Sequence, residues 1–427
     1  MPSHWENKPE NPSNLRLYMP GEGWRAFSDK LKEDEPRAVE QEGSRALIES
    51  AFLNALNASN LLVLTGAGTS FAATNAAGQA QAPGMTDLWS AVKTAATDKV
   101  FDAVCEQFSD AKIENNIEKL LSLCKIFLEL HENAHENNEA VKQIKQFVAD
   151  AEKTILQKMD FVSSDTEVGS HALVVRKIGR RGVRKSRTKI FTTNYDLCFE
   201  EAARRQRFTV IDGFSHSLDQ FYDRTHFDFD LVRRETGQDA PNYIANVFHL
   251  YKLHGSVDWR RFGSEIMRSR SDDGLPVLIY PRSSKYQEAF EPPYLDMLGA
   301  FQAALREPDT ALIVSGFGFN DDHISRPVLA ALEANMSLRL IVCDPIFIGS
   351  KDELDKGDHA IGATALPNKF LARFQKLVDA GDPRIHLING RFADMALTLP
   401  DLVGETDRER HASRVRALRD GAEGKPK

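Results

Sequence analysis

The stretch Leu61-Leu-Val-Leu-Thr-Gly-Ala-Gly-Thr-Ser70 decides the fold of this chain. Four apolar residues run directly into a turn that contains Gly66 and Gly68, and a short apolar run bounded by glycines is typical of a buried strand. Glycine has no Cβ, so the backbone can turn sharply and approach a ligand closely. Backbone amides at a strand-to-helix turn attract phosphate. The stretch therefore predicts a nucleotide site at the edge of a parallel sheet. Because the third glycine of the dinucleotide fingerprint is missing, a tight turn without a ligand remains the alternative.

The composition indicates a soluble globular protein. Hydrophobic residues make up 42% and charged residues 27% of the 427 positions, a balance that allows a full core. The net charge of −8 argues against a surface that is basic throughout, as a dedicated nucleic-acid-binding protein would have. Apolar runs fall short of the roughly 20 residues that a membrane helix needs, and the first residues, MPSHWENKPENPSN, lack the apolar core of an export signal. We expect a cytoplasmic protein without membrane contact.

The cysteines give no sign of a structural zinc site. They are scattered, and none forms the C-x-x-C pair from which a tetrahedral thiolate site is built. Unpaired cysteines without a secretory signal also fit a reducing cytoplasm. We therefore expect no bound metal. The cysteines are Cys105, Cys124, Cys198 and Cys343.

Outward from the opening stretch, apolar residues alternate between helical and strand spacing. A helix is expected over 44–58, and a block of helical periodicity over about 86–175 follows the glycine loop. Alternating strands and helices in the rest of the chain predict an α/β fold, with a Rossmann-like doubly wound parallel sheet and an inserted helical subdomain. The remaining strands are expected near 188–193, 207–211, 247–253, 277–281, 310–316, 338–344 and 384–388.

The two ends of the chain differ from the middle in composition. Residues 1–40 are rich in proline and charge and are expected to form an N-terminal arm. Its aromatic residues could dock on a neighbouring subunit or on the chain's own core. Residues 41–400 are expected to form one catalytic domain, and residues 401–427 a polar C-terminal tail.

A strongly basic run, RKIGRRGVRKSRTK, occupies residues 176–189. A solvated loop or helix end is the simpler interpretation of such a run. The other interpretation is a patch for nucleic acid or an acidic partner, although aromatic residues are not interleaved with the charges. The sequence leaves both open.

Three polar motifs follow expected strands. They are Gly66–Ser70, Thr192-Thr-Asn-Tyr-Asp196 and Leu253-His-Gly-Ser256. In an open α/β sheet, ligands bind at the edge formed by the carboxyl ends of the strands. Each motif has a simpler interpretation when taken alone: the Asn and Asp of the second could cap the following helix, and the His of the third could be a core histidine. Together they predict one polar site.

The combination resembles the sirtuin superfamily, and specifically its bacterial branch of sirtuin-like NAD hydrolases, over residues 44–346. GAGTS is similar to the GAG-x-S loop of that family, TTNYD to its T-x-N-x-D motif, and LHGS to its His-Gly motif. The segment ALIVSGFGFNDDHI (311–324) is similar to its late glycine-containing strand and loop. IYPRSSKYQEAF (279–290) and NIEKLLS (116–122) are also typical of the prokaryotic branch.

The resemblance implies a role for each polar residue. Asn194 would hold the ribose hydroxyls or position water, and His254 would act as general base toward a ribose hydroxyl or the attacking water. Asp196 would bind the nicotinamide carboxamide, and Asp344, after its strand, the adenosine ribose. The resemblance therefore implies Asn194 and His254 as catalytic residues, and as binding residues for NAD+ it implies Gly66, Ala67, Gly68, Thr69, Ser70, Asp196, Gly255, Gly316, Phe317 and Asp344.

Two departures from the family separate this chain from its protein deacylases. The paired zinc cysteines are missing, and the Pro-Asp-Phe-Arg segment that follows the glycine loop in deacylases is replaced by FAATNAAGQAQAPG. We therefore expect NAD+ to be a substrate that water hydrolyses to nicotinamide and ADP-ribose. The resemblance further implies an effector of anti-phage defence that depletes NAD+, a homo-oligomer, and a HerA-type ATPase partner through which nucleic acid could be engaged. The alternatives are a zinc-less deacylase and a non-catalytic scaffold that binds NAD or ADP-ribose.

Overall fold

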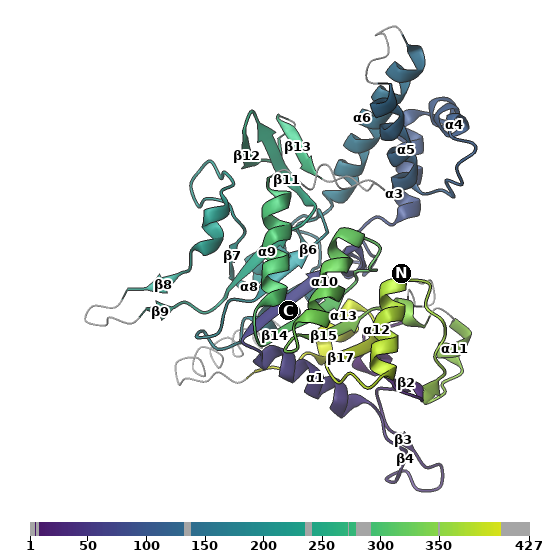
Figure 1. Ribbon diagram of the computed structural model, residues 1–427, viewed down its shortest axis with the longest axis vertical. Helices are drawn as coiled ribbons and strands as arrows, with labels where there is room; N and C mark the ends of the chain where they lie inside the picture. Colours follow the sequence, from purple (N-terminus) through teal and green to yellow (C-terminus); the bar gives the residue numbers. More distant parts are fainter. Residues whose placement is uncertain are drawn as a thin grey trace.

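A ten-stranded sheet forms the centre of the computed structural model, in the order β16-β2-β1-β17-β15-β14-β5-β6-β10-β7 (Figure 1). The strands from β17 to β7 pair in parallel. They are β5 (Asn60–Thr65), β6 (Lys189–Thr192), β7 (Thr209–Ile211), β10 (Val247–Lys252), β14 (Thr310–Ser315), β15 (Arg339–Cys343) and β17 (Ile385–Asn389). The structure describes residues 5, 8–131, 138–234, 241–271, 273–278, 292–348 and 351–402.

Helices cover both faces of this sheet, because successive strand residues point to opposite sides. In β5, Val63 belongs to one hydrophobic cluster and Leu62 and Leu64 to the other. The first cluster packs under α1 (Arg45–Asn57), α7 (Gly169–Ile178), α8 (Cys198–Gln206) and α13 (Phe392–Thr398). The second packs under α9 (Tyr294–Arg306), α10 (Asp322–Ala334) and α12 (Lys369–Asp379) (Figure 1). The doubly wound α/β fold predicted from the sequence is confirmed.

The strand order reverses at β5. The chain passes from β5 to β6 on one side of it, whereas β14 lies on its other side and is followed outward by β15 and β17. Connections that leave in opposite directions open a crevice at the carboxyl ends of the two central strands. The fold thus directs a ligand to the ends of β5 and β14.

The N-terminal segment is part of the sheet, and the expectation of an arm over 1–40 is wrong for its central part. Strands β1 (Arg16–Met19) and β2 (Gly23–Ala26) extend the sheet antiparallel beyond β17, and β16 (Ala360–Ile361) completes the edge. Trp5 and Trp24 are buried against this edge. The aromatic residues that could have bound a neighbour lie instead in the chain's own core, since burying them there removes apolar surface from water.

A separate group of helices projects from the carboxyl edge of the sheet (Figure 1). It consists of α3 (Met85–Ala96), α4 (Asp98–Gln107), α5 (Ile117–Leu130) and α6 (Glu139–Met159). Phe101 forms edge-on contacts with Trp89 and Phe147, which join α4 to α3 and α6. We call these helices the helical lobe; it lies between β5 and β6 in the sequence. The inserted helical subdomain is therefore present, but it is shorter than the 86–175 expected, because α7 (Gly169–Ile178) packs against α8 and α13.

The strand expected over 277–281 does not join the main sheet. Its described part belongs to β13 (Leu275–Leu278), which pairs antiparallel with β11 (Gly255–Phe262) beside β12 (Glu265–Arg268). Residues 279–290, which the sequence comparison used, lie outside the described residues, as do 403–427 of the expected tail. Two short hairpins complete the strands: β3 (Lys30–Leu31) with β4 (Val39–Gln41), and β8 (Val232–Arg233) with β9 (Asn242–Tyr243).

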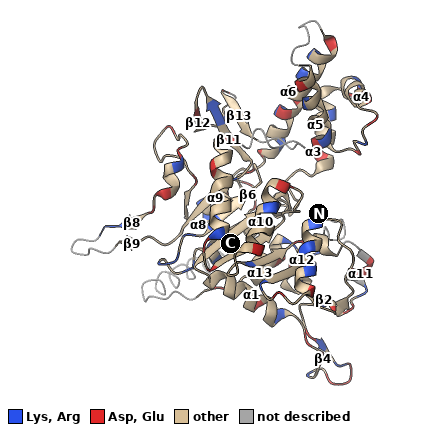
Figure 2. Ribbon diagram, viewed as in Figure 1, with Lys and Arg blue, Asp and Glu red and all other residues tan. Residues whose placement is uncertain are grey.

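The basic run 176–189 is partly built into the fold. Its first residues end α7, in agreement with the helix-end interpretation, whereas the solvated-loop interpretation is wrong for Lys177 and Arg181. Arg181 is buried and donates to the carbonyls of Leu56 and Ala58 at the end of α1. Lys177 is buried and donates to carbonyls at the end of α13. Arg184 is the one exposed cation of the run. Both signs of charge are interspersed over the rest of the molecule (Figure 2).

No helix in the described part of the chain is both long enough and apolar enough to cross a membrane.

Candidate active site

The ends of β5, β6, β10 and β14 meet around a pocket of about 370 Å³. This is within the size range of small-molecule sites, and it lies where the strand order reverses. Two further residues of the pocket wall, Asn320 and Asp321, follow β14 in the same loop as Gly316. Of the residues proposed from the sequence, the structure brings together in this pocket Gly66, Ala67, Ser70, Asn194, Asp196, His254, Gly316 and Phe317.

The glycine loop is held by close contact with the loop after β14. The amide of Gly68 donates to the carbonyl of Gly316 at 2.9 Å. A Cβ at Gly68 would lie 2.6 Å from Gly316 Cα, and Gly316 itself has a φ of +63°. Gly68 is therefore required because a side chain would not fit, and Gly316 because its positive φ favours glycine.

This contact changes the expected role of the glycine loop. The amide and the hydroxyl of Thr69 both donate to the carbonyl of Gly66, at 2.9 and 3.0 Å. The amides of Gly68 and Thr69 are therefore already hydrogen-bonded within the protein, whereas the sequence predicted that amides of this loop would bind phosphate. Gly68 and Thr69 stabilise the loop without lining the pocket, whereas Gly66, Ala67 and Ser70 line it.

Asn194 and Asp196 are joined to the glycine loop by a chain of polar contacts. Asn194 Nδ2 donates to Thr69 Oγ1 at 3.1 Å and to Ser70 Oγ at 2.8 Å. Ser70 Oγ in turn donates to Asp196 Oδ2 at 2.5 Å. All four side chains are buried. Buried polar groups that satisfy one another fix their rotamers, so the loops after β5 and β6 act as one rigid unit.

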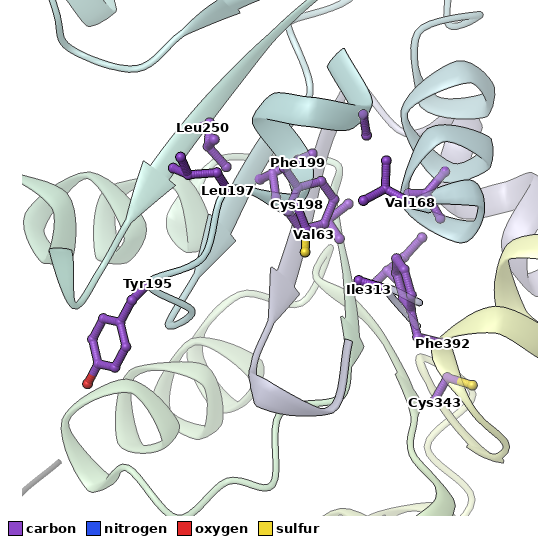
Figure 3. Packing of buried hydrophobic residues seen from close by; sticks show 14 of the residues in the cluster. Val63, Val168, Tyr195, Leu197, Cys198, Phe199, Leu250, Ile313, Cys343 and Phe392 are labelled. Carbon is purple, nitrogen blue, oxygen red and sulfur yellow. The ribbon is translucent and has the colours of Figure 1, made fainter. Parts of the chain in front are cut away.

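The turn that carries Asn194 is fixed to the sheet on both sides. The amide of Thr193 donates to the carbonyl of Thr65 at 3.1 Å. Leu197, Cys198 and Phe199 belong to the first hydrophobic cluster. Tyr195 belongs to it too, although its ring points away from the other labelled side chains (Figure 3). The Cys198 amide donates to Asp196 Oδ1 at 3.0 Å, and Leu197, not Asp196, occupies the N-cap position of α8. Burial raises the pKa of the Cys198 thiol, which keeps it protonated and unreactive.

His254 faces a second histidine that the sequence interpretation did not identify. Its Nε2 lies 3.1 Å from Nε2 of His323, in the first turn of α10, with the rings 5.3 Å apart between centroids. An N···N contact at this distance needs a proton on one nitrogen and a lone pair on the other. His323 is in the segment 311–324, so the signal was present, but its pairing with His254 depends on where α10 begins.

Besides Gly68 and Thr69, two further residues of the sequence hypothesis lie outside the pocket wall. Gly255 has a φ of +88°, and a Cβ there would lie 2.1 Å from the carbonyl of Val277, so it forms the sharp turn after His254. Asp344 follows β15 and accepts from the Ile346 amide at 3.0 Å. Burial raises its pKa to about 6.

The helical lobe supplies a wall of the pocket that the sequence motifs did not indicate. Met85 and Leu88 come from α3 and Met159 from the end of α6, with Phe161 just beyond it. Glu118, in the first turn of α5, adds a carboxylate. Sequence periodicity marks these residues only as parts of helices, because facing the pocket is a property of how the lobe packs.

In the part of the chain that the structure describes, no group of three or more His, Cys, Asp or Glu side chains is arranged to hold a metal ion.

Comparison with known proteins finds a similarity that covers part of this site. Residues 188–351 match the model of the SIR2-like domain, a range that contains Asn194, His254 and His323 but not the glycine loop. No curated protein matches the chain. Among solved structures, a Sir2 enzyme studied for its mechanism and regulation has 11% sequence identity and a TM-score of 0.34, and a mutant Sir2 homologue in complex with ADP-ribose has 13% and 0.37. Each match covers 86% of this chain and 98% of the other. This chain is therefore similar to the SIR2-like domain over residues 188–351.

Proposed function

We propose that this protein is an NAD+ glycohydrolase, which uses water to cleave NAD+ into nicotinamide and ADP-ribose. The observation that carries the proposal is the meeting of Asn194 and His254 with the glycine loop in one pocket at the switch point of the sheet. A binding module would need the crevice and the loop alone. The similarity of residues 188–351 to the SIR2-like domain supports NAD-related chemistry at this site.

The polar residues have chemical roles that fit this reaction. Cleavage of the N-glycosidic bond passes through an oxocarbenium-like ribose, and the bond's electron pair leaves with nicotinamide. Water adds to the anomeric carbon and releases a proton, for which the imidazole of His254 is the general base. The Asn194 amide, held by Thr69 and Ser70, is positioned to orient the ribose hydroxyls or the water. Rigid polar groups of this kind stabilise developing charge without reorganising.

The helical lobe supplies apolar surface to the pocket, which Leu88, Met159 and Phe161 contribute. Such surface lowers the local polarity and strengthens the electrostatic contacts that polar residues make with a developing charge. The choice of water over an acyl-lysine acceptor rests on the missing pairs of zinc cysteines. The lobe also occupies sequence between β5 and β6, where the sequence analysis found helical residues in place of a zinc-binding segment.

Incubation of the purified protein with NAD+ tests the proposal. We expect stoichiometric nicotinamide and ADP-ribose by chromatography, and a loss of kcat by about 100-fold or more in Asn194→Ala and His254→Ala, the scale for removing an acid–base group. His216→Ala replaces an exposed histidine outside the pocket and should leave turnover unchanged. Nicotinamide formed only with an acylated peptide would identify a deacylase, and binding of ADP-ribose without any turnover a scaffold.

The wider role that the sequence resemblance implies extends this proposal. Depletion of NAD+ during phage infection requires that hydrolysis be restrained until infection, and assembly with a HerA-type ATPase into a homo-oligomeric complex would supply such restraint. The measurement is cellular NAD+ after infection, with and without the ATPase gene, in cells that carry either the wild type or His254→Ala. If cells with the wild type and cells with His254→Ala lose equal amounts of NAD+ after infection, the defence role is contradicted, whereas the hydrolase assignment is not.

A further inference from the structure

A buried ammonium group lies behind the proposed active site, between the two loops that carry Asn194 and His254. Lys252 is the last residue of β10 and is 2% exposed. Its side chain runs from the strand toward the turn after β6, not toward solvent. Lysine is rarely buried unless its charge is paired, so we expect Lys252 to have polar partners inside the protein.

Lys252 holds the backbone of the Asn194 turn. Its Nζ donates to the carbonyl of Tyr195 at 3.2 Å and also to the carbonyl of Asp196. These two carbonyls directly follow Asn194 in the chain. The Tyr195 carbonyl also accepts from the Val257 amide at 3.0 Å. The backbone next to Asn194 is therefore held by the ammonium group of Lys252, a residue that does not line the pocket.

The same ammonium holds the segment after His254. Lys252 Nζ donates to Ser256 Oγ at 2.9 Å, and Ser256 in turn donates to Asp258 at 2.5 Å. Ser256 is two residues beyond His254, across the sharp turn at Gly255. A tetrahedral ammonium with three donors on a four-carbon stem can satisfy acceptors on two loops at once. One side chain thus joins both loops.

A carboxylate on the following helix balances this charge. Glu200, on α8, lies 3.0 Å from Lys252 Nζ. Burial raises the pKa of Glu200, and Lys252 opposes that rise. The polar chain continues through Asp258 to Arg268, which pairs with Asp212 at 2.7 Å. The two loops are therefore connected to one fixed polar core behind the pocket.

From these contacts we infer that Lys252 is a positioning residue for the hydrolysis, setting the distance and orientation between Asn194 and His254. The inference rests on the proposed NAD+ hydrolysis and adds a residue outside the pocket to it. The glycine loop and the loop after β14 take no part in the Lys252 contacts described above. Loss of the ammonium should therefore impair the chemical step more than the binding of NAD+.

Lys252→Met tests this, because methionine keeps an unbranched stem and removes the donors. We expect kcat to fall by about 100-fold, the scale for misplacing a catalytic group by about 1 Å, with KM for NAD+ within about threefold. Lys177→Met is the matched control. Lys177 is also buried and also donates to two backbone carbonyls, but these are in α13. This control should lower Tm and leave kcat unchanged.

Further variants keep the test decisive if Lys252→Met does not fold. The double variant Lys252→Met, Glu200→Gln also removes the buried carboxylate, and Ser256→Ala removes only one acceptor. Both should lower kcat with KM maintained, and Ser256→Ala by less. The inference about Lys252 would be overturned if whichever of these variants folds kept a kcat within threefold of the wild type, or if Lys177→Met lowered kcat equally. Neither result would overturn the proposed function. A wild type without NAD+ turnover would overturn the proposed function, and with it this inference.

Discussion

His254, in the wall of the candidate site, contacts His323 directly, with the two Nε2 atoms 3.1 Å apart. One ring must donate and the other accept, so the tautomers of the two histidines depend on each other. His323 comes from α10, which begins after the glycine-containing loop of β14. His254, the proposed general base, is thus contacted by an element far from it in sequence.

Replacing His323 should therefore slow hydrolysis through His254. We expect His323→Phe to lower kcat by about 10-fold, because the ring of His254 loses its orienting partner, while His323→Gln, which keeps a polar group, retains more activity. Affinity for ADP-ribose, measured by calorimetry, should change little in either variant. Equal activity in His323→Phe and the wild type would show that the contact has no part in catalysis.

Gly68→Ala should disturb the glycine loop. Its Cβ would lie 2.6 Å from Gly316 Cα, with backbone on both sides of the contact. We expect a loss of about 2 kcal/mol in unfolding free energy, typical of overpacking, together with weaker NAD+ binding. The control is Gly299→Ala in α9, where a Cβ meets nothing within 4 Å and should stabilise by about 0.5–1 kcal/mol. Similar thermal shifts in the two variants would contradict the close contact.

Asp344 should make stability depend on pH. Burial raises its pKa from 3.8 to about 6, so between these values the native state binds more protons than the unfolded chain. The unfolding free energy then falls as pH rises through this window. Asp344→Asn removes this effect, and we expect a gain in stability that reaches at most about 3 kcal/mol above pH 6 and shrinks toward pH 4. Urea unfolding of both proteins at pH 4.5 and pH 8 measures it, and a gain that is larger at pH 4.5 would contradict the assignment.

The basic run should act through stability. Arg181 donates to carbonyls of Leu56, Ala58 and Ser59, and Arg181→Met would leave buried acceptors without donors, at a cost of about 1–3 kcal/mol for each such group. Arg184→Met, at the exposed position of the run, should change stability by less than about 0.5 kcal/mol. Thermal unfolding gives both values. A loss of nucleic-acid binding in Arg184→Met at unchanged stability would instead favour the nucleic-acid interpretation.

Local pattern was sufficient for the sheet and for the motifs on its edge. The apolar run before Gly66 and the strands that alternate with helices required a doubly wound fold, because strands buried on both faces must be apolar throughout. Asn194 and His254 each follow an expected parallel strand, and the carboxyl ends of such strands form the ligand-binding edge of the sheet. The pattern failed for residues 1–40, where short strands separated by charge and proline become ordered only by pairing with β17.

Spacing along the chain was enough to predict the parallel strands of the main sheet that alternate with helices, the glycine loop, and the polar residue types that follow three of these strands. The tertiary structure alone decided which groups meet. It set Gly68 against Gly316, His254 against His323, and Lys252 beneath the Asn194 turn. It also turned residues of the helical lobe toward the pocket and buried Lys177 and Arg181 of the basic run. Such contacts join residues distant in sequence, and their geometry follows from how helices and loops pack on the sheet.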